Sequence, residues 1–122
     1  MKNIPFSATA INSGFWKYYE NLDRNVTVKA VYDRFLETGR FAALKCNWRE
    51  GMENMPHVYW DSDVVKWMEG AAYIMEKQPN EKLLQLVNEL VEMIEQGTKE
   101  DGYYNSYYNN PEVDEPRFTD RN

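Results

Sequence analysis

Residues 59–97 read YWDSDVVKWMEGAAYIMEKQPNEKLLQLVNELVEMIEQG, and this stretch decides the fold class. Two runs in it carry apolar residues at the spacing of a helix. Pro79 separates them, because the residue before a proline avoids helical backbone angles. We expect one helix from about Asp63 to Lys77 and another from about Glu81 to Gln96, which ends at Gly97. The stretch therefore predicts two consecutive helices.

The helix expected at about Asp63 to Lys77 differs from an ordinary amphipathic helix. Its second side carries small or semi-polar residues instead of the Glu, Lys and Gln of an exposed face. We therefore expect this helix to be buried on more than one side. If nothing in the chain covers Lys66, Gly70 and Tyr73, the domain is incomplete. The first face consists of Val64, Trp67, Met68, Ala71, Ala72 and Met75, and the second of Asp63, Lys66, Gly70 and Tyr73.

A further amphipathic helix is expected earlier in the chain, from about Val26 to Thr38. Asn25 can cap its start, and Gly39 can close its end in a left-handed conformation. Its remaining faces are charged, so one side should meet solvent. The chain is thus predicted to be all-α, with about three helices joined by long loops that are rich in aromatic residues.

These loops, at about residues 41–60 and 98–122, are where we look for a functional site. The chain of 122 residues holds 4 Trp, 9 Tyr and 5 Phe, or 15% aromatic residues, which is a surplus for a globular protein. Many of these rings lie in the two loops. Connections of about 20 residues without regular structure are uncommon in a compact domain unless they carry function.

Two carboxylates stand where the first loop enters the helix predicted at about Asp63 to Lys77. Asp61 should project along the buried face, and Asp63 should turn away toward Lys66. A glycosidase needs two carboxyl groups about 5 to 9.5 Å apart that face one bond, and diverging side chains do not supply that geometry. We favour a role for Asp61 or Ser62 as a helix cap, with contact to a ligand as the alternative.

The second loop carries the sequence EDGYYNSYY at residues 100–108. Aromatic faces and amide groups are suited to sugar recognition, because the apolar face of a sugar stacks on a ring while its hydroxyls need oriented donors and acceptors. The alternative is that the tyrosine rings pack the loop onto the helices. The predicted substrate-binding residues are Trp60, Asp61, Asp63, Tyr103 and Asn105.

Charge and composition exclude several classes of function. The net charge of −6 and the lack of Lys or Arg clusters argue against nucleic acid and against an anionic membrane surface. The chain has no apolar run long enough for a signal peptide or a membrane span, so we expect a cytoplasmic location. The single Cys46 and the single His57 are interpreted as structural residues. We predict neither a catalytic residue nor a metal ligand in this chain.

Six segments of the chain, in this order, carry a resemblance to a known family. They resemble the N-terminal end of the β-L-arabinofuranosidases of glycoside hydrolase family 127, and together they cover nearly the whole chain. The segments are Ser13-Gly14-Phe15-Trp16, Asn25-Val26-Thr27, Thr38-Gly39-Arg40, PHVYWDSDVVKW at residues 56–67, DGYYNSY at residues 101–107, and Arg117-Phe118-Thr119.

The resemblance implies a catalytic barrel of paired helices, (α/α)6, followed by β-sandwich domains in a much longer protein. Members are implied to be retaining enzymes that release L-arabinofuranose, with a zinc-bound cysteine nucleophile and a glutamate acid/base. Those residues correspond to positions beyond Asn122, and Cys46 does not match them. We therefore expect residues 1–122 to be a truncated, inactive N-terminal part of the barrel domain, with no cofactor of its own.

The resemblance also implies an L-arabinofuranose-containing oligosaccharide as the substrate. The remainder of the barrel or a second copy of the chain is the expected protein partner. Two alternatives stay open from the residues alone: a non-catalytic carbohydrate-binding module that uses the same aromatic residues, and a small helical module that docks on another chain.

Overall fold

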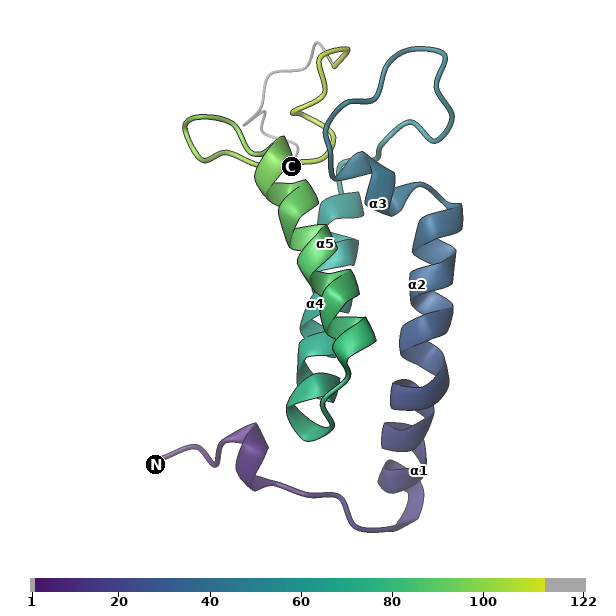
Figure 1. The fold of residues 1–122 in the computed structure, drawn as a ribbon, viewed down its shortest axis with the longest axis vertical. Helices are drawn as coiled ribbons and strands as arrows, with labels where there is room; N and C mark the ends of the chain where they lie inside the picture. Colours follow the sequence, from purple (N-terminus) through teal and green to yellow (C-terminus); the bar gives the residue numbers. More distant parts are fainter. Residues whose placement is uncertain (1, 114–122) are drawn as a thin grey trace, which may run out of the picture.

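A computed structural model describes residues 2–113, and all regular secondary structure within them is helical (Figure 1). This confirms the all-α class and is consistent with a partial segment of a helical barrel domain. The motif Arg117-Phe118-Thr119 lies outside the described residues. The elements are the 3₁₀ turn η1 (Phe6–Ala8), α1 (Gly14–Leu22), the π-helical turn η2 (Asp23–Thr27), α2 (Val28–Glu37), α3 (Arg40–Ala43), α4 (Trp60–Lys77) and α5 (Glu81–Gly97).

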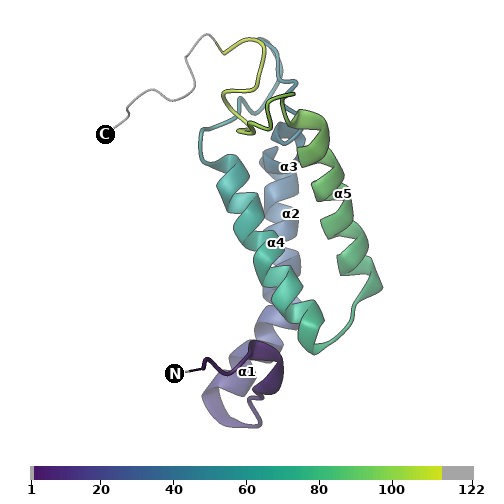
Figure 2. The same cartoon turned by 90° about the vertical axis from the view of Figure 1, so that its left-hand side faces the viewer.

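The first long helical segment is α1, η2 and α2 in direct succession (Figures 1 and 2). The expected start near Val26 with Asn25 as a cap is wrong, because Asn25 lies inside the π-helical turn and the helix begins at Gly14. Leu22 and Val28, on either side of the turn, both keep right-handed helical angles, so the backbone needs no side-chain cap there. The end is as expected, with Gly39 left-handed at φ 76°.

The helix α4 begins at Trp60, three residues earlier than expected. The interpretation of Asp61 or Ser62 as a helix cap is wrong, because both lie inside the first turn. The backbone starts the helix instead, since the amide of Trp60 donates to the carbonyl of His57 at 3.0 Å. The hydroxyl of Ser62 donates to the carbonyl of Tyr59 at 2.9 Å, and the residue at the N-cap position, Tyr59, makes no side-chain capping bond.

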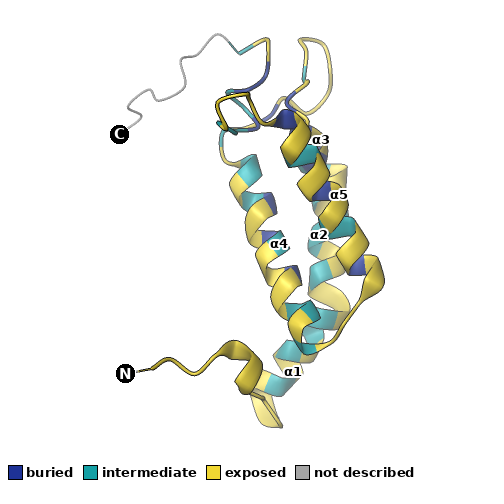
Figure 3. Ribbon diagram, turned by 60° about the vertical axis from the view of Figure 1, so that its left-hand side comes forward, coloured by how far each residue is buried: buried dark blue, intermediate teal, exposed yellow. Residues whose placement is uncertain are grey.

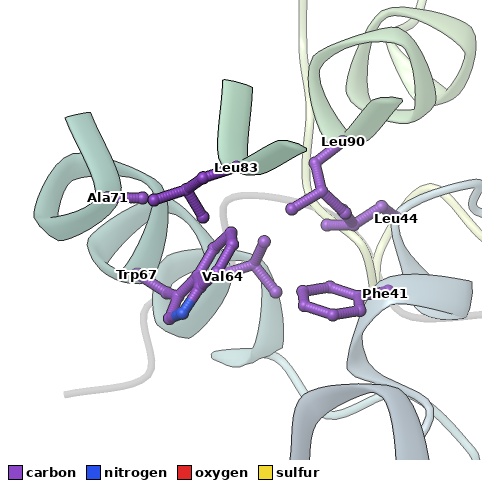
Figure 4. Close-up of a cluster of buried hydrophobic side chains, with 7 residues drawn as sticks. All are labelled: Phe41, Leu44, Val64, Trp67, Ala71, Leu83 and Leu90. Atoms are coloured by element: carbon purple, nitrogen blue, oxygen red, sulfur yellow. The ribbon is translucent and has the colours of Figure 1, made fainter. Parts of the chain in front are cut away.

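The helix expected at about Glu81 to Gln96 is confirmed as α5. Its first amides are satisfied by Asn80, whose side chain accepts from the amide of Leu83 at 3.1 Å. The helices α4 and α5 lie side by side, and α2 and α3 pack against α4 (Figure 2). The core lies where these elements meet (Figure 4). It consists of Phe41, Leu44, Val64, Trp67, Ala71, Leu83 and Leu90.

The helix α4 is buried on one side only, which corrects the expectation of burial on several sides. Lys66 and Gly70 are exposed, and Tyr73 is 48% exposed, with its ring centre 5.0 Å from that of Phe6. The α4 residues of the core come from the other face, and among residues 2–113 most of the second face is open to solvent (Figure 3). Because Phe6 contacts Tyr73, only Lys66 and Gly70 of the three stay open among residues 2–113, and an incomplete domain stays a prediction.

Among residues 2–113, no helix has the length and apolar character needed to cross a membrane.

Candidate functional site

The first loop and the described part of the second, residues 98–113, lie together over one end of the helical bundle (Figure 1). The first loop leads into α4 at Trp60, and the second leaves α5 after Gly97. The start of α4 and the second loop are therefore neighbours in space, although about 40 residues separate them in the sequence. This brings the predicted site residues of the two segments to the same end of the molecule.

Asp61 and Asn105 are in direct contact. The side-chain amide of Asn105 donates to Oδ2 of Asp61 at 3.0 Å and to the carbonyl of Val58 at 3.2 Å. The same carboxylate oxygen accepts from the amide of Ser106 at 3.4 Å, and Oδ1 accepts from the amide of Ser62 at 2.7 Å. The carboxylate of Asp61 therefore ties the second loop to the first turn of α4.

Other side-chain amides shape the second loop from within. Asn109 and Asn110 are each 3% exposed, and sequence reasoning missed both as structural residues. The side-chain amide of Asn109 donates to the carbonyls of Gly97 at 2.9 Å and Tyr103 at 3.2 Å. Oδ1 of Asn110 accepts from the amide of Trp48 at 2.8 Å, which joins the two loops. An unusually high asparagine content in a loop is the sequence signal for such a network.

The tyrosines of the second loop do not share one role. The ring of Tyr104 packs against the core, and its hydroxyl donates to the carbonyl of Leu44 at 3.0 Å. Tyr104 therefore follows the packing alternative. Tyr103 is half-buried, and its backbone N–H donates to Oδ1 of Asp101 at 3.1 Å. A sugar contact by Tyr103 stays a prediction.

Trp60 and Asp63 meet at Arg40, which sequence reasoning did not single out. Nε of Arg40 donates to Oδ2 of Asp63 at 3.3 Å, and its guanidinium carbon lies 5.2 Å from the ring centre of Trp60. Asp63 therefore pairs with Arg40, whereas the sequence pattern predicted that it would turn toward Lys66. The only sequence signal was the place of Arg40 in the motif Thr38-Gly39-Arg40, since Trp60 and Asp63 lie on α4, Asp63 being 23 positions away.

Cys46 lies beneath the second loop with a left-handed backbone, φ 51°, and is 8% exposed. Its thiol donates to the carbonyl of Leu44 at 3.5 Å. Burial raises its pKa to about 11, so near neutral pH the group is a thiol and not the thiolate that attacks or binds a metal. Burial also raises the pKa of Tyr104. His57 is exposed, and its ring lies 5.3 Å from that of Tyr59.

The raised pKa of Cys46 predicts a loss of stability in alkali. The folded chain holds the proton up to about pH 11, while the unfolded chain releases it near 9.0. Stability from this group is complete below pH 9 and is lost as the pH rises toward 11, by on the order of 2 kcal/mol. Urea unfolding at pH 8 and pH 11 should show a smaller loss for Cys46→Ala than for the wild type. An equal loss in both would contradict the prediction.

The side chains present do not fit the zinc that the family resemblance implies. Within residues 2–113, no three side chains of His, Cys, Asp or Glu come close enough together to hold a metal ion. No step of a mechanism through zinc is therefore assigned to these residues.

Two hollows in the surface differ in their distance from the predicted site residues. One of about 300 Å³ lies beside the site and is lined by Met55, Pro56, His57, Val58 and Tyr107. Another of about 330 Å³ lies between η2 and α4, far from the loops, with Arg24, Trp67 and Tyr73 in its wall. The hollow beside the loops thus belongs to the same end of the molecule as the predicted site residues.

Comparisons with known proteins agree with the motifs. A family model described as the β-L-arabinofuranosidase catalytic domain of glycoside hydrolase family 127 matches residues 9–121. A non-reducing end β-L-arabinofuranosidase of Bifidobacterium longum subsp. longum is 37% identical over 65 residues, which are 51% of this chain and 10% of that protein. The chain thus spans about a tenth of the length of this curated relative. No solved structure matches the chain. Because the family model covers nearly the whole sequence, the chain belongs to glycoside hydrolase family 127.

Proposed function

We propose that this chain forms the first helices of the catalytic (α/α)6 barrel of a retaining glycoside hydrolase that releases L-arabinofuranose from β-L-arabinofuranosides. The observation that carries the proposal is the family match over residues 9–121, to a catalytic domain and not to an accessory module. The name of the relative, a non-reducing end β-L-arabinofuranosidase, supports the substrate class.

The exposed apolar surface supports the part of the proposal that concerns the barrel. Large apolar side chains on α1, α4 and α5 are exposed to solvent, whereas a complete soluble domain would cover most of them. Trp16 is 69% exposed, Val65 50% and Leu84 49%. The uncovered side of α4 is the face on which a neighbouring barrel helix would pack. A helical module that docks on another chain would use the same face and is the alternative function.

Within this proposal, the start of α4 and the second loop form one wall of the sugar pocket. Trp60 and Tyr103 offer ring faces for the sugar, and Asp63 offers a carboxylate that is 37% exposed for its hydroxyls. Asp61 and Asn105 hold the second loop against α4 and so determine where Tyr103 stands. The five predicted substrate-binding residues thus divide into three that face the ligand and two that support them.

We expect the isolated chain to hydrolyse no 4-nitrophenyl β-L-arabinofuranoside, with or without added zinc. The implied nucleophile is a zinc-bound thiolate, and Cys46 is a buried thiol without metal ligands among the described residues. The measurement is release of 4-nitrophenol over hours at high protein concentration. Release that survives Cys46→Ala would show that other groups in this chain perform the reaction, against the proposal.

The sugar wall is tested by titration of the labelled chain with methyl β-L-arabinofuranoside, followed by NMR. We expect weak binding that shifts resonances of Trp60, Asp63 and Tyr103, because a pocket with one wall leaves most of the sugar in water. Trp60→Ala should abolish the shifts of Asp63 and Tyr103. Trp16→Ala is the matched control, since this tryptophan is exposed on α1 at the opposite end of the bundle (Figure 1). Shifts confined to α5 would remove the site from consideration.

A further inference from the structure

Arg40 occupies the point where three helices meet. It is the first residue of α3, directly after the left-handed Gly39. Its guanidinium carbon lies 5.2 Å from the ring centre of Phe35 on α2 and 5.2 Å from that of Trp60 on α4. A guanidinium within about 6 Å of an aromatic face is attracted by the electrons of the ring. Arg40 therefore contacts both Phe35, which packs against the core, and Trp60, a predicted sugar-binding residue.

Two hydrogen bonds fix the plane of this guanidinium. Nη1 donates to the hydroxyl of Thr38 at 2.7 Å, and Nε donates to Oδ2 of Asp63 at 3.3 Å. The side chain of Arg40 is 24% exposed and that of Asp63 is 37% exposed, so the pair lies at the surface but is partly shielded from water. The end of α2 thus holds one edge of the guanidinium, and α4 holds another.

We propose that Arg40 is a positioning residue that sets the plane of the Trp60 ring and the direction of the Asp63 carboxylate for an L-arabinofuranoside. The inference rests on the proposed function, because it concerns two residues of the proposed sugar wall. The inference adds Arg40, which lies outside the loops, to the proposed sugar wall. It also explains why the ring of Trp60 and the carboxylate of Asp63, three positions apart on α4, are held side by side.

Arg40 preorganises the ring and the carboxylate for the ligand. A tryptophan and an aspartate at the surface sample several rotamers, and a ligand that needs one arrangement must order them when it binds. A planar guanidinium that touches the ring and pairs with the carboxylate removes that freedom beforehand. Lysine cannot replace it, because an ammonium is a point charge without a flat face or a second fixed N–H edge.

The test compares Arg40→Lys and Arg40→Met with the wild type in NMR titrations with methyl β-L-arabinofuranoside. We expect Arg40→Met to weaken binding by about tenfold, or to leave no saturable shift at Trp60. Arg40→Lys keeps the charge and the long side chain but should weaken binding nearly as much. Arg34→Met is the matched control. Arg34 lies on α2, its side chain is 71% exposed, and within residues 2–113 its one ion pair is with Glu37. It should bind as the wild type does.

A spectroscopic signature separates positioning from simple support of the fold. In the wild type, the Hδ and Hε protons of Arg40 should show a ring-current shift. Without sugar present, Trp60→Ala should remove part of this shift, because the ring of Phe35 stays in place. Far-UV circular dichroism and thermal melting establish that each variant is folded. If Arg40→Met does not fold, Arg40→Lys decides the question.

The outcomes distinguish the two proposals. If Trp60→Ala abolishes binding while Arg40→Lys and Arg40→Met bind as tightly as the wild type, the positioning role is overturned and the sugar wall stands. If Trp60→Ala leaves the titration unchanged, or if the wild type shows no sugar-dependent shift, the sugar wall falls and the role of Arg40 falls with it. Weakened binding in both Arg40 variants, with the ring-current shift present in the wild type, supports the inference.

Discussion

Trp67→Ala is expected to destabilise the chain by about 3–5 kcal/mol, the largest effect we predict for a single truncation. Trp67 is 8% exposed, and its ring lies 5.5 Å from the ring of Tyr32 and 6.0 Å from that of Phe41. Its Nε1 donates to the carbonyl of Val28 at 2.9 Å. Removal of the indole therefore opens a cavity between α2, α3 and α4 and loses a hydrogen bond that joins two helices.

The measurement is chemical denaturation followed by circular dichroism, with Trp16→Ala as the matched control. Trp16 has the same side chain but is 69% exposed, so its removal should change the free energy of unfolding by no more than about 0.5 kcal/mol. Equal effects of the two substitutions would show that Trp67 is not part of a packed core. Because a small domain has little stability to lose, Trp67→Ala is expected to be largely unfolded at 37 °C.

Gly97→Ala is expected to destabilise the chain by about 3 kcal/mol, although alanine is the better helix former. A Cβ at this position would lie 2.5 Å from the carbonyl oxygen of Leu44 and 2.9 Å from Sγ of Cys46. The nearest contact is backbone, which cannot turn aside as a flexible side chain can. The last turn of α5 would have to move away from the first loop.

Gly70→Ala provides the matched control for this effect. Gly70 also lies within a helix, but a Cβ there would meet no described atom within 4 Å. The substitution should stabilise the chain by about 0.5–1 kcal/mol, since glycine in a helix interior has more conformational freedom to lose. If thermal melting showed Gly97→Ala to be as stable as Gly70→Ala, the close approach of α5 to the first loop would be disproved.

The Gly97 contact also matters for the proposed sugar wall. The carbonyl of Gly97 accepts from the side chain of Asn109, which in turn donates to the carbonyl of Tyr103. A shift of this turn would therefore move the loop that presents Tyr103. Gly97→Ala should weaken the response of Tyr103 to methyl β-L-arabinofuranoside more than that of Trp60, whose own support comes from Arg40 on the other side.

Local interactions explain what could be predicted from the sequence. An α-helix is held by hydrogen bonds between residues four positions apart, so apolar spacing and the break at Pro79 were sufficient to place α5 and most of α4. The same local rules failed at the starts of two helices. At α4, backbone hydrogen bonds from the preceding turn replaced the expected side-chain cap. The helix expected to start near Val26 instead continues α1 through a π-helical turn.

By itself, the sequence determined the helical class, the order of the long helices and, through its motifs, membership of glycoside hydrolase family 127. Only the tertiary structure decided the partners of the candidate site residues. Asp61 bonds Asn105, 44 positions away, and Asp63 pairs with Arg40, 23 positions away. The physical reason is range: a helix follows from neighbours along the chain, whereas a carboxylate takes whichever donor the packing of distant segments brings within about 3 Å.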